Sequence, residues 1–388
     1  MRIGIIAGEY PPHQGGVGAY TRIIALRLIE LGHSVSILCG NDAIEPDDRI
    51  HLQNSITSWN ILSLRQISRW ATAEKLDIIN IQFETAAFGM SPWVHFIPRI
   101  TSVPVVTTFH DLLVPYLFPK AGALRQWITR YLAQKSNGII LTNQEDYAQT
   151  NAIKMRKLIP IGSNISTTLP ADFDRSRWRE TMGVNSDDFL MAHFGFMNRT
   201  KGIEILLEDM AVIRQHYQYP LKLVMIGGKT GYSDPSNADY ADEIDSKIQR
   251  LQLEDSIIWT GYVDDTEVSA HLIASDVVVL PFKDGASYRR GSLMAAIHHG
   301  CAIITTAPRV YVPTFVDEEN MLLARALILD ESIPPYTHVS QEILLLYRNP
   351  ELREKLRHGA SKLAGHFDWK GIAKKYVDFF NVVLGVQS

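Results

Sequence analysis

Two adjacent arginines, Arg289 and Arg290, lie in the stretch DGASYRRGSLMAAIHHG, directly after the apolar run VVVLPF. The pattern predicts a buried strand followed by the start of a helix. A helix N-terminus is partly positive, so each cation there costs about 0.3–1 kcal/mol unless an anion is present. Ser287, Gly291 and Ser292 would let a ligand approach backbone N–H groups. These residues therefore favour an anion-binding helix N-terminus.

A glycine-rich turn follows the first predicted strand. In EYPPHQGGVGAY, Gly15 and Gly16 precede a helix predicted over Gly18–Leu31. Glycines at such a turn allow a phosphate to approach the backbone closely. The dinucleotide-binding fingerprint is excluded, because Thr21 stands where it requires glycine or alanine. The alternative is a plain turn that only leads into the helix.

Similar turns open the second half of the chain. FGFMNRTKGIEILLEDM places Arg199 and Lys201 between a strand and a helix, and MIGGKTGYSD places Gly227 and Gly228 after another strand. A lysine at a helix start can bind a diphosphate as a point charge. The alternative is that Arg199 and Lys201 are solvated loop charges.

Composition limits the possible functions. The chain has 388 residues, 46% hydrophobic and 21% charged, and a net charge of −4. These values predict an ordinary globular protein and no nucleic-acid partner. Its two cysteines stand in separate halves, so neither a disulfide framework nor a zinc site is expected. No signal peptide or membrane span is predicted, and the expected location is the cytoplasm.

Strand and helix patterns alternate along the chain, which predicts an α/β fold with parallel sheets. The pattern breaks over 159–174, which we interpret as a linker. We therefore predict an N-terminal Rossmann-like domain over 1–168 and a C-terminal Rossmann-like domain over 169–370. A final helix over 371–388 is expected to pack back on the first domain. A ligand would bind at the carboxyl ends of the strands.

Several motifs together resemble one enzyme family. They are EYPPHQGGVGAY, TTFHD, KGIEILL, GY, SDVVVLP and MAAIHHG, in this order along nearly the whole chain. The chain thus resembles the retaining glycosyltransferases of family four (group 1). The resemblance implies the GT-B fold, with two Rossmann-like doubly wound domains facing each other across a cleft. It also implies a nucleotide diphosphate-sugar donor, no metal and no cofactor.

The resemblance also implies roles for particular residues. Gly15 and Gly16 would face the donor diphosphate, and His110 of the catalytic His110–Asp111 pair would lie beside the donor sugar. Lys201 matches the lysine of a basic pair that holds the diphosphate. The arginine of that pair is replaced by Phe196, and the resemblance leaves Arg199 as its nearest substitute. A structural role for the His110–Asp111 pair is the alternative.

One segment departs from the family. Two glutamates that contact the donor sugar and the ribose would fall on Ser287 and Ala295. Three interpretations of Arg289 and Arg290 follow. They bind the donor in a divergent transferase, they belong to a protein that binds nucleotide-sugar without turnover, or they are solvated and paired with Asp284. Another GT-B activity, such as a nucleotide-sugar epimerase, is a further alternative.

The acceptor side is expected in the first domain. Glu84 in QFETAAFGM and the residues Arg125 and Trp127 in a basic aromatic helix are the candidates. They would bind a glycan, a small molecule or a lipid-linked acceptor, and the lipid case would place the protein peripherally on the inner face of the membrane. The alternative is ordinary packing with the arginines in water. The pattern makes no prediction of the oligomeric state.

Overall fold

The computed structural model describes residues 1–13, 15–112, 122–228, 237–324 and 338–386, with backbone only for 122–126, 237–238 and 338. The chain forms two compact units. The first contains Met1–Asn164 together with Phe367–Ser388, and the second contains Ile165–His366. Residues 159–174, where the linker is expected, hold no helix or strand.

The first unit is built on a seven-stranded parallel sheet with the order β3-β2-β1-β4-β5-β6-β7. Its five central strands are buried on both faces along most of their length, as expected when helices cover both sides of a parallel sheet, whereas the edge strands β3 and β7 are polar and more exposed. The strand order reverses between β1 and β4, so the sheet has its topological switch point there. The strands are β1 (Arg2–Ala7), β2 (Ser34–Gly40), β3 (His51–Ile56), β4 (Ile78–Phe83), β5 (Val105–Phe109), β6 (Gly138–Leu141) and β7 (Arg156–Leu158).

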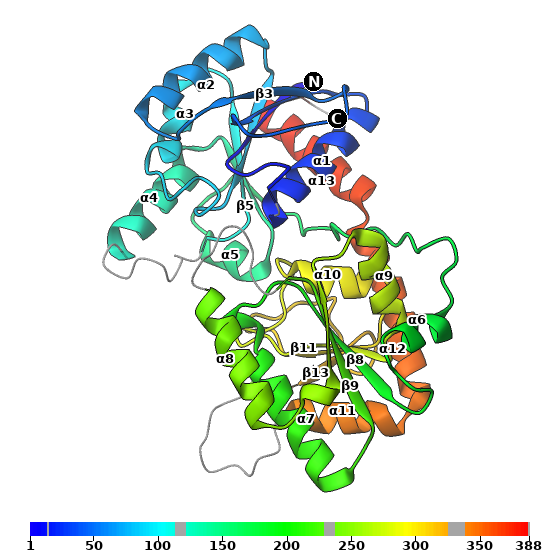
Figure 1. Ribbon diagram of the computed structural model, residues 1–388. Helices are drawn as coiled ribbons and strands as arrows, with labels where there is room; N and C mark the ends of the chain where they lie inside the picture. The colour runs from blue at the N-terminus through cyan, green and yellow to red at the C-terminus, as the bar shows by residue number, and fades with distance from the viewer. Residues whose placement is uncertain (14, 113–121, 229–236, 325–337, 387–388) are drawn as a thin grey trace. The chain divides into compact units, whose positions relative to one another are not determined.

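Helices cover both faces of this sheet (Figure 1). The C-terminal helix α13 packs against α1, so the end of the chain returns to the unit in which it began. Helices α2, α3 and α4 pack together as a second group. The helices are α1 (Gly16–Glu30), α2 (Ile61–Ala73), α3 (Ile97–Ile100), α4 (Gly122–Lys135), α5 (Gln144–Gln149) and α13 (Trp369–Leu384), with a short 3-10 helix η1 (Trp93–Phe96).

The second unit repeats the plan with a six-stranded sheet, β10-β9-β8-β11-β12-β13. The order reverses between β8 and β11. A hydrophobic core cluster of this unit packs α7, α8 and α11 against one face of the sheet. The strands are β8 (Phe189–Phe194), β9 (Leu221–Ile226), β10 (Ile257–Gly261), β11 (Val277–Leu280), β12 (Ile303–Thr306) and β13 (Leu322–Ala324).

Helices α6 and α9 pack together, as do α10 and α12. The helices of the second unit are α6 (Arg175–Thr181), α7 (Ile203–Tyr217), α8 (Asn237–Arg250), α9 (Asp265–Ala274), α10 (Gly291–His298), α11 (His338–Arg348) and α12 (Pro350–Ala364), with the 3-10 helices η3 (Arg199–Lys201), η4 (Glu254–Ser256) and η5 (Gly365–Phe367). The sequence-based prediction of an α/β fold with two doubly wound parallel sheets is confirmed.

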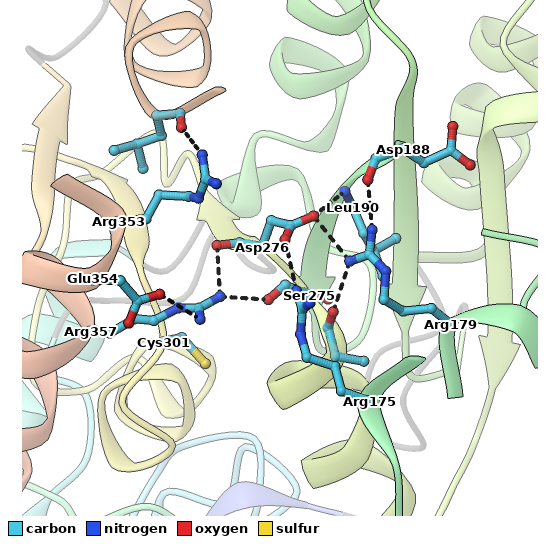
Figure 2. A network of polar contacts seen from close by, with 12 residues as sticks. Arg175, Arg179, Asp188, Leu190, Ser275, Asp276, Cys301, Arg353, Glu354 and Arg357 are labelled. Atoms are coloured by element: carbon cyan, nitrogen blue, oxygen red, sulfur yellow. Dashed lines mark hydrogen bonds and ion pairs between the residues drawn. The ribbon is translucent and has the colours of Figure 1, made fainter. Parts of the chain in front are cut away.

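An arginine network joins the amino-terminal ends of β8 and β11. The Asp276 carboxylate accepts hydrogen bonds from Leu190 N at 2.8 Å, from Arg179 Nη1 at 3.0 Å and from Arg175 Nη2 at 2.7 Å. Figure 2 shows these side chains converging on Asp276, with Arg357 bonded to nearby backbone carbonyls. The network fixes the two central strands at the end opposite to the one from which the site loops emerge.

Candidate donor and sugar sites

The carboxyl ends of β8 and β9 are each followed by a glycine with a positive φ. Gly195 has φ +111° and Gly227 has φ +113°, and the two lie against each other, because a Cβ on Gly227 would meet Gly195 C at 3.5 Å. L side chains rarely adopt this backbone conformation. The two glycines therefore leave an open backbone surface beside the switch point, where ligands of such sheets bind.

Lys201 covers that surface. A Cβ on Gly195 would meet Lys201 Nζ at 2.1 Å, so the ammonium group lies directly over this glycine. Burial, and then the charge of Arg290, lowers the pKa of Lys201 to about 7. Below it, His193 donates from Nδ1 to Val279 O at 3.0 Å, and its pKa is lowered to about 3, chiefly by burial. The ring is therefore neutral, and Lys201 is the only one of these two groups charged near neutral pH.

Arg289 and Arg290 lie in the loop between β11 and α10, and they are not solvated. Their side chains are 12% and 16% exposed, and both pair with the Asp284 carboxylate. Arg290 also donates to Thr200 Oγ1 at 3.3 Å and lies 4.8 Å over the Phe282 ring. With Lys201 charged, the cluster of Lys201, Arg289, Arg290 and Asp284 has three positive charges and one negative charge, which suits an anionic ligand.

Helix α10 begins immediately after the arginines. Arg290 is its N-cap residue, and among the described residues no side chain caps the helix. Gly291 is exposed, whereas Ser292 is buried with its Cβ 3.9 Å from the Cβ position of Gly195. Ser287 Oγ accepts from Arg289 N at 3.3 Å, so it shapes the loop. The open N–H groups of α10 thus lie beside Lys201, as an anion site requires.

Arg199 lies apart from this cluster. Its guanidinium pairs with Glu243 of α8, stacks 5.0 Å over the Tyr240 ring, and is 57% exposed. The arginine that accompanies Lys201 is therefore Arg290, which comes from a distant loop. Gly228 ends the described segment after β9 and is partly buried.

In the first unit, the glycine turn contains a carboxylate of the protein itself. A Cβ on Gly15 would meet Glu9 Oε1 at 1.5 Å, and the same oxygen accepts from Gly18 N at 3.2 Å. The partly positive end of α1 attracts this carboxylate. Burial raises the pKa of Glu9, and the nearby Glu84 raises it further. Around Gly16, in contrast, no described atom lies within 4 Å of a built Cβ.

His110 follows β5 and is held from two sides. Its Nε2 lies 2.8 Å from Gln82 Oε1, and its ring makes a T-shaped contact with the Tyr20 ring, with the ring centroids 4.9 Å apart. Burial lowers the pKa of His110 to about 4, so the ring is neutral at pH 7. Asp111 is partly buried beside it. A neutral histidine fixed in this way can serve as a hydrogen-bonding group rather than as a charge.

The acceptor-side candidates lie on two different elements, the loop after β4 and helix α4. Glu84 accepts from Ala86 N at 3.1 Å and Ala87 N at 2.7 Å, so it stabilises the loop after β4. Trp127 on α4 is 55% exposed. The side chain of Arg125 lies outside the described residues.

Sequence reasoning missed several side chains at these sites. Gln82, Thr200 and Phe282 lie within predicted strands or turns and carry no motif of their own. The signal for Gln82 was its place in DIINIQF, where a polar residue stands in an otherwise apolar buried strand. Within the described ranges, no three His, Cys, Asp or Glu side chains are grouped to hold a metal ion. Nor does any helix in those ranges have the length and apolarity to cross a membrane.

Family models match both units. The model for glycosyl transferases group 1 matches residues 174–363, and the model for Glycosyltransferase Family 4 matches residues 14–159. The chain belongs to this family of glycosyltransferases. It is 21% identical over 309 residues to alpha-monoglucosyldiacylglycerol synthase of Streptococcus pneumoniae, an alignment that covers 72% of this chain and 65% of the synthase.

Solved structures show the same fold. The chain is similar to sucrose-phosphate synthase from Thermosynechococcus elongatus, with a TM-score of 0.77, 20% identity and 99% of each chain covered. It is also similar to Anabaena HepE in complex with UDP and glucose, with a TM-score of 0.73, 17% identity, and coverage of 97% of this chain and 98% of that chain. The predicted GT-B fold class and the predicted membership of family four are confirmed.

Proposed function

We propose that this glycosyltransferase takes its sugar from a nucleotide diphosphate-sugar and that the second unit binds the donor diphosphate. One observation carries the proposal. Lys201 lies over Gly195, one of two adjacent positive-φ glycines at the switch point, and its charge neighbour Arg290 shares the Asp284 carboxylate with Arg289 at the open N-terminus of α10. Backbone N–H groups, a helix dipole and cations together form a binding site for phosphates. Because the similar Anabaena protein was crystallised with UDP and glucose, UDP-sugars are the first donors to test.

The proposed reaction proceeds with retention of configuration. The bond between the anomeric carbon and the diphosphate oxygen breaks, and the acceptor oxygen bonds to that carbon from the same face. The acceptor proton passes to the departing phosphate oxygen. The negative charge that develops on the diphosphate is stabilised by Lys201, by Arg290 and by the α10 N-terminus. Such preorganised groups are worth several kcal/mol in a site shielded from water.

Arg290 provides the direct test of this function. We expect Arg290→Ala to weaken UDP binding at least about tenfold, equivalent to about 1.4 kcal/mol, because a guanidinium next to Lys201 is lost. Calorimetry of the full chain with UDP, first without and then with magnesium, measures the change. Arg250→Ala, which removes an exposed arginine at the end of α8, is the matched control. Equal affinities of the wild type and Arg290→Ala for UDP would show that Arg290 does not bind the donor.

A second candidate function rests on the absent carboxylates. Ser287 and the fully buried Ala295 stand where the family resemblance expects glutamates, so donor binding without turnover is the alternative. Release of UDP from a UDP-sugar, assayed with and without candidate acceptors, separates the two. Acceptor-dependent release supports the transferase, whereas tight binding with no release supports the silent binder.

We also propose that the first unit acts at a membrane surface. Trp127 of α4 is 55% exposed and Trp93 of η1 is 36% exposed, while Arg130 of α4 lies in water. Helix α4 packs against η1, which brings the two tryptophans to one region of the unit. Exposed tryptophans next to arginines are typical of surfaces that bind anionic lipid headgroups.

Membrane binding is testable at Trp127. We expect Trp127→Glu to reduce binding to vesicles of mixed anionic and neutral phospholipids about tenfold. The substitution removes an apolar contact and adds a negative charge, which the anionic headgroups repel. Sedimentation with the vesicles measures the bound fraction. Tyr311→Glu is the control, because Tyr311 is a 78% exposed aromatic residue of the second unit. Equal losses in the two variants, or none, would contradict a surface centred on α4.

A further inference from the structure

A chain of buried polar side chains lies beneath His110. Gln82 and Asn80 alternate on β4, and Thr108 lies on the neighbouring strand β5. They are 0%, 1% and 0% exposed, respectively. Buried polar groups in a sheet interior are costly unless they are hydrogen-bonded to one another. Here each is bonded, and the bonds form a path that ends at the histidine ring.

The direction of the path is fixed at its far end. Asn80 Nδ2 lies 3.1 Å from the backbone oxygen of Val106, which can only accept, so the amide nitrogen must face it. Asn80 Oδ1 therefore points the other way and accepts from Gln82 Nε2 at 2.5 Å. That leaves Gln82 Oε1 toward His110 Nε2 at 2.8 Å. An amide oxygen only accepts, so the proton of the neutral ring must be on Nε2.

A second branch connects the C-terminal helix to the same ring. Thr108 Oγ1 accepts from Asn80 Nδ2 at 3.0 Å and bonds to the Tyr376 hydroxyl at 3.1 Å. The Tyr376 hydroxyl also bonds to the Tyr20 hydroxyl at 2.9 Å. The Tyr20 ring is the one whose contact orients His110, and it also packs on Trp369 at the start of α13. Helix α13 thus supports the histidine both through the hydrogen-bonded path to Gln82 and through the Tyr20 ring that packs on it.

We propose that Asn80, Gln82 and Tyr376 are positioning residues that hold His110 as the Nε2–H tautomer and leave its Nδ1 lone pair open to a sugar hydroxyl group. Nδ1 has no hydrogen-bond partner among the described residues. The assignment of the sugar hydroxyl rests on the proposed function, whereas the tautomer rests on the hydrogen bonds alone. Asn80, Gln82 and Tyr376 are distant from the His110–Asp111 pair in the sequence and come close to His110 only in the folded chain.

The tautomer can be measured directly in the wild-type protein. Nitrogen-15 NMR of the full chain labelled at histidine distinguishes protonated from unprotonated ring nitrogens, and a His110→Phe sample identifies the His110 signals. We expect the proton on Nε2 and a lone pair on Nδ1 near pH 7. A proton on Nδ1, or a rapid mixture of the two tautomers, would overturn the proposal.

Two variants of Gln82 then separate positioning from packing. Gln82→Met removes the acceptor for Nε2–H, so we expect the Nδ1–H tautomer to become populated. Gln82→Glu keeps an oxygen acceptor and should keep the proton on Nε2. Loss of the Nε2 proton in both variants, or in neither, contradicts a role for this oxygen. Gln134→Met, at an exposed position of α4, is the control for the substitution itself.

Ligand affinities test the contact with the sugar. In Gln82→Met and Tyr376→Phe, we expect affinity for UDP-glucose to fall about fivefold, roughly 1 kcal/mol, while affinity for UDP stays unchanged. A purely structural defect would lower both affinities equally, and that result would overturn the sugar contact. If the wild-type protein binds neither ligand, the proposed function fails, and the tautomer measurement alone decides the role of Gln82.

Discussion

Lys201→Met is expected to lower the affinity for UDP about a hundredfold, because it removes the charge closest to the proposed diphosphate position. The lysine ammonium lies over Gly195 and is partly buried, so an unpaired phosphate charge beside it would be poorly solvated. Arginines 289 and 290 share the Asp284 carboxylate and cannot substitute for it fully. Lys362→Met, at an exposed position of α12, is the control, and calorimetry compares the two.

The same lysine predicts a pH dependence with a definite sign. Its pKa is lowered to about 7, chiefly by burial and further by Arg290, so the free protein loses this charge as pH rises through neutrality. A bound diphosphate favours the charged form, which means that binding requires proton uptake above the pKa. We expect UDP affinity to fall by up to about tenfold per pH unit above about pH 7.

Lys201→Arg tests whether the pH dependence comes from the titration of Lys201, because it keeps a positive charge at this position but removes the titration. An arginine stays charged throughout this range, so the variant should bind UDP with a nearly flat pH profile. Lys201→Met should also lose the slope, but at much weaker affinity. A slope that persists in both variants would assign the titration to another group. An unchanged affinity for UDP in Lys201→Met would show that the diphosphate does not bind beside the two glycines.

The fold was predictable because its strands are unusually clear in the sequence. RIGIIA and LKLVMI are apolar except for Arg2 and Lys222, as expected of strands that are buried on both faces over most of their length. The start of the first helix was less clear. The pattern predicted Gly18, whereas α1 begins at Gly16, because Gly16 has no side chain and Val17 is only partly buried, so neither extends the apolar face of the helix.

The partners of Lys201 could not be predicted in the same way. Arg199 is its neighbour in sequence, but it pairs with Glu243 and Tyr240, which lie on a later helix. Arg290 reaches the site because the β8–β11 switch point brings two distant loops together. The spacing of residues in the sequence does not indicate which arginine lies beside Lys201. That choice depends on which side chains compete for each guanidinium after folding.

The first unit shows the same limit. The glycine turn at Gly15 was predicted, but the carboxylate that fills the space beside it comes from Glu9, a residue of the same motif to which the sequence analysis gave no role. Sequence reasoning did not single out Asn80 or Gln82, which are polar residues in an otherwise apolar run. Their meaning depends on the neighbouring strand, which supplies Val106 O as the fixed acceptor. Local patterns indicate that such residues are unusual, and only the sheet register shows what they bind.

The largest expected effect on stability lies at Asp276, far from the ligand sites. Its carboxylate is bonded to the Leu190 amide and to Arg179, and the Arg179 side chain is 8% exposed. Arg179 also donates to Ala274 O at 3.0 Å and Asp188 O at 2.6 Å, so it cannot turn toward water without breaking these bonds. Removing the carboxylate leaves a buried guanidinium without its counter-charge, which typically costs about 3–5 kcal/mol.

Asp276→Asn is therefore expected to destabilise the second unit by about 3 kcal/mol, because the amide keeps the shape but loses the charge. Glu354→Gln is the matched control. That carboxylate is 71% exposed and pairs with Arg357 at 3.0 Å, so its loss should cost less than about 0.5 kcal/mol. Hydrogen exchange of the β8 and β11 peptides in the full chain, followed through a urea titration, measures the unit directly. Equal shifts of the unfolding midpoint in the two variants would mean that the network in Figure 2 contributes no special stability to the second unit. A selective shift would instead show that the sheet end opposite to the site loops holds β8 and β11 in the register that brings Lys201 and Arg290 together.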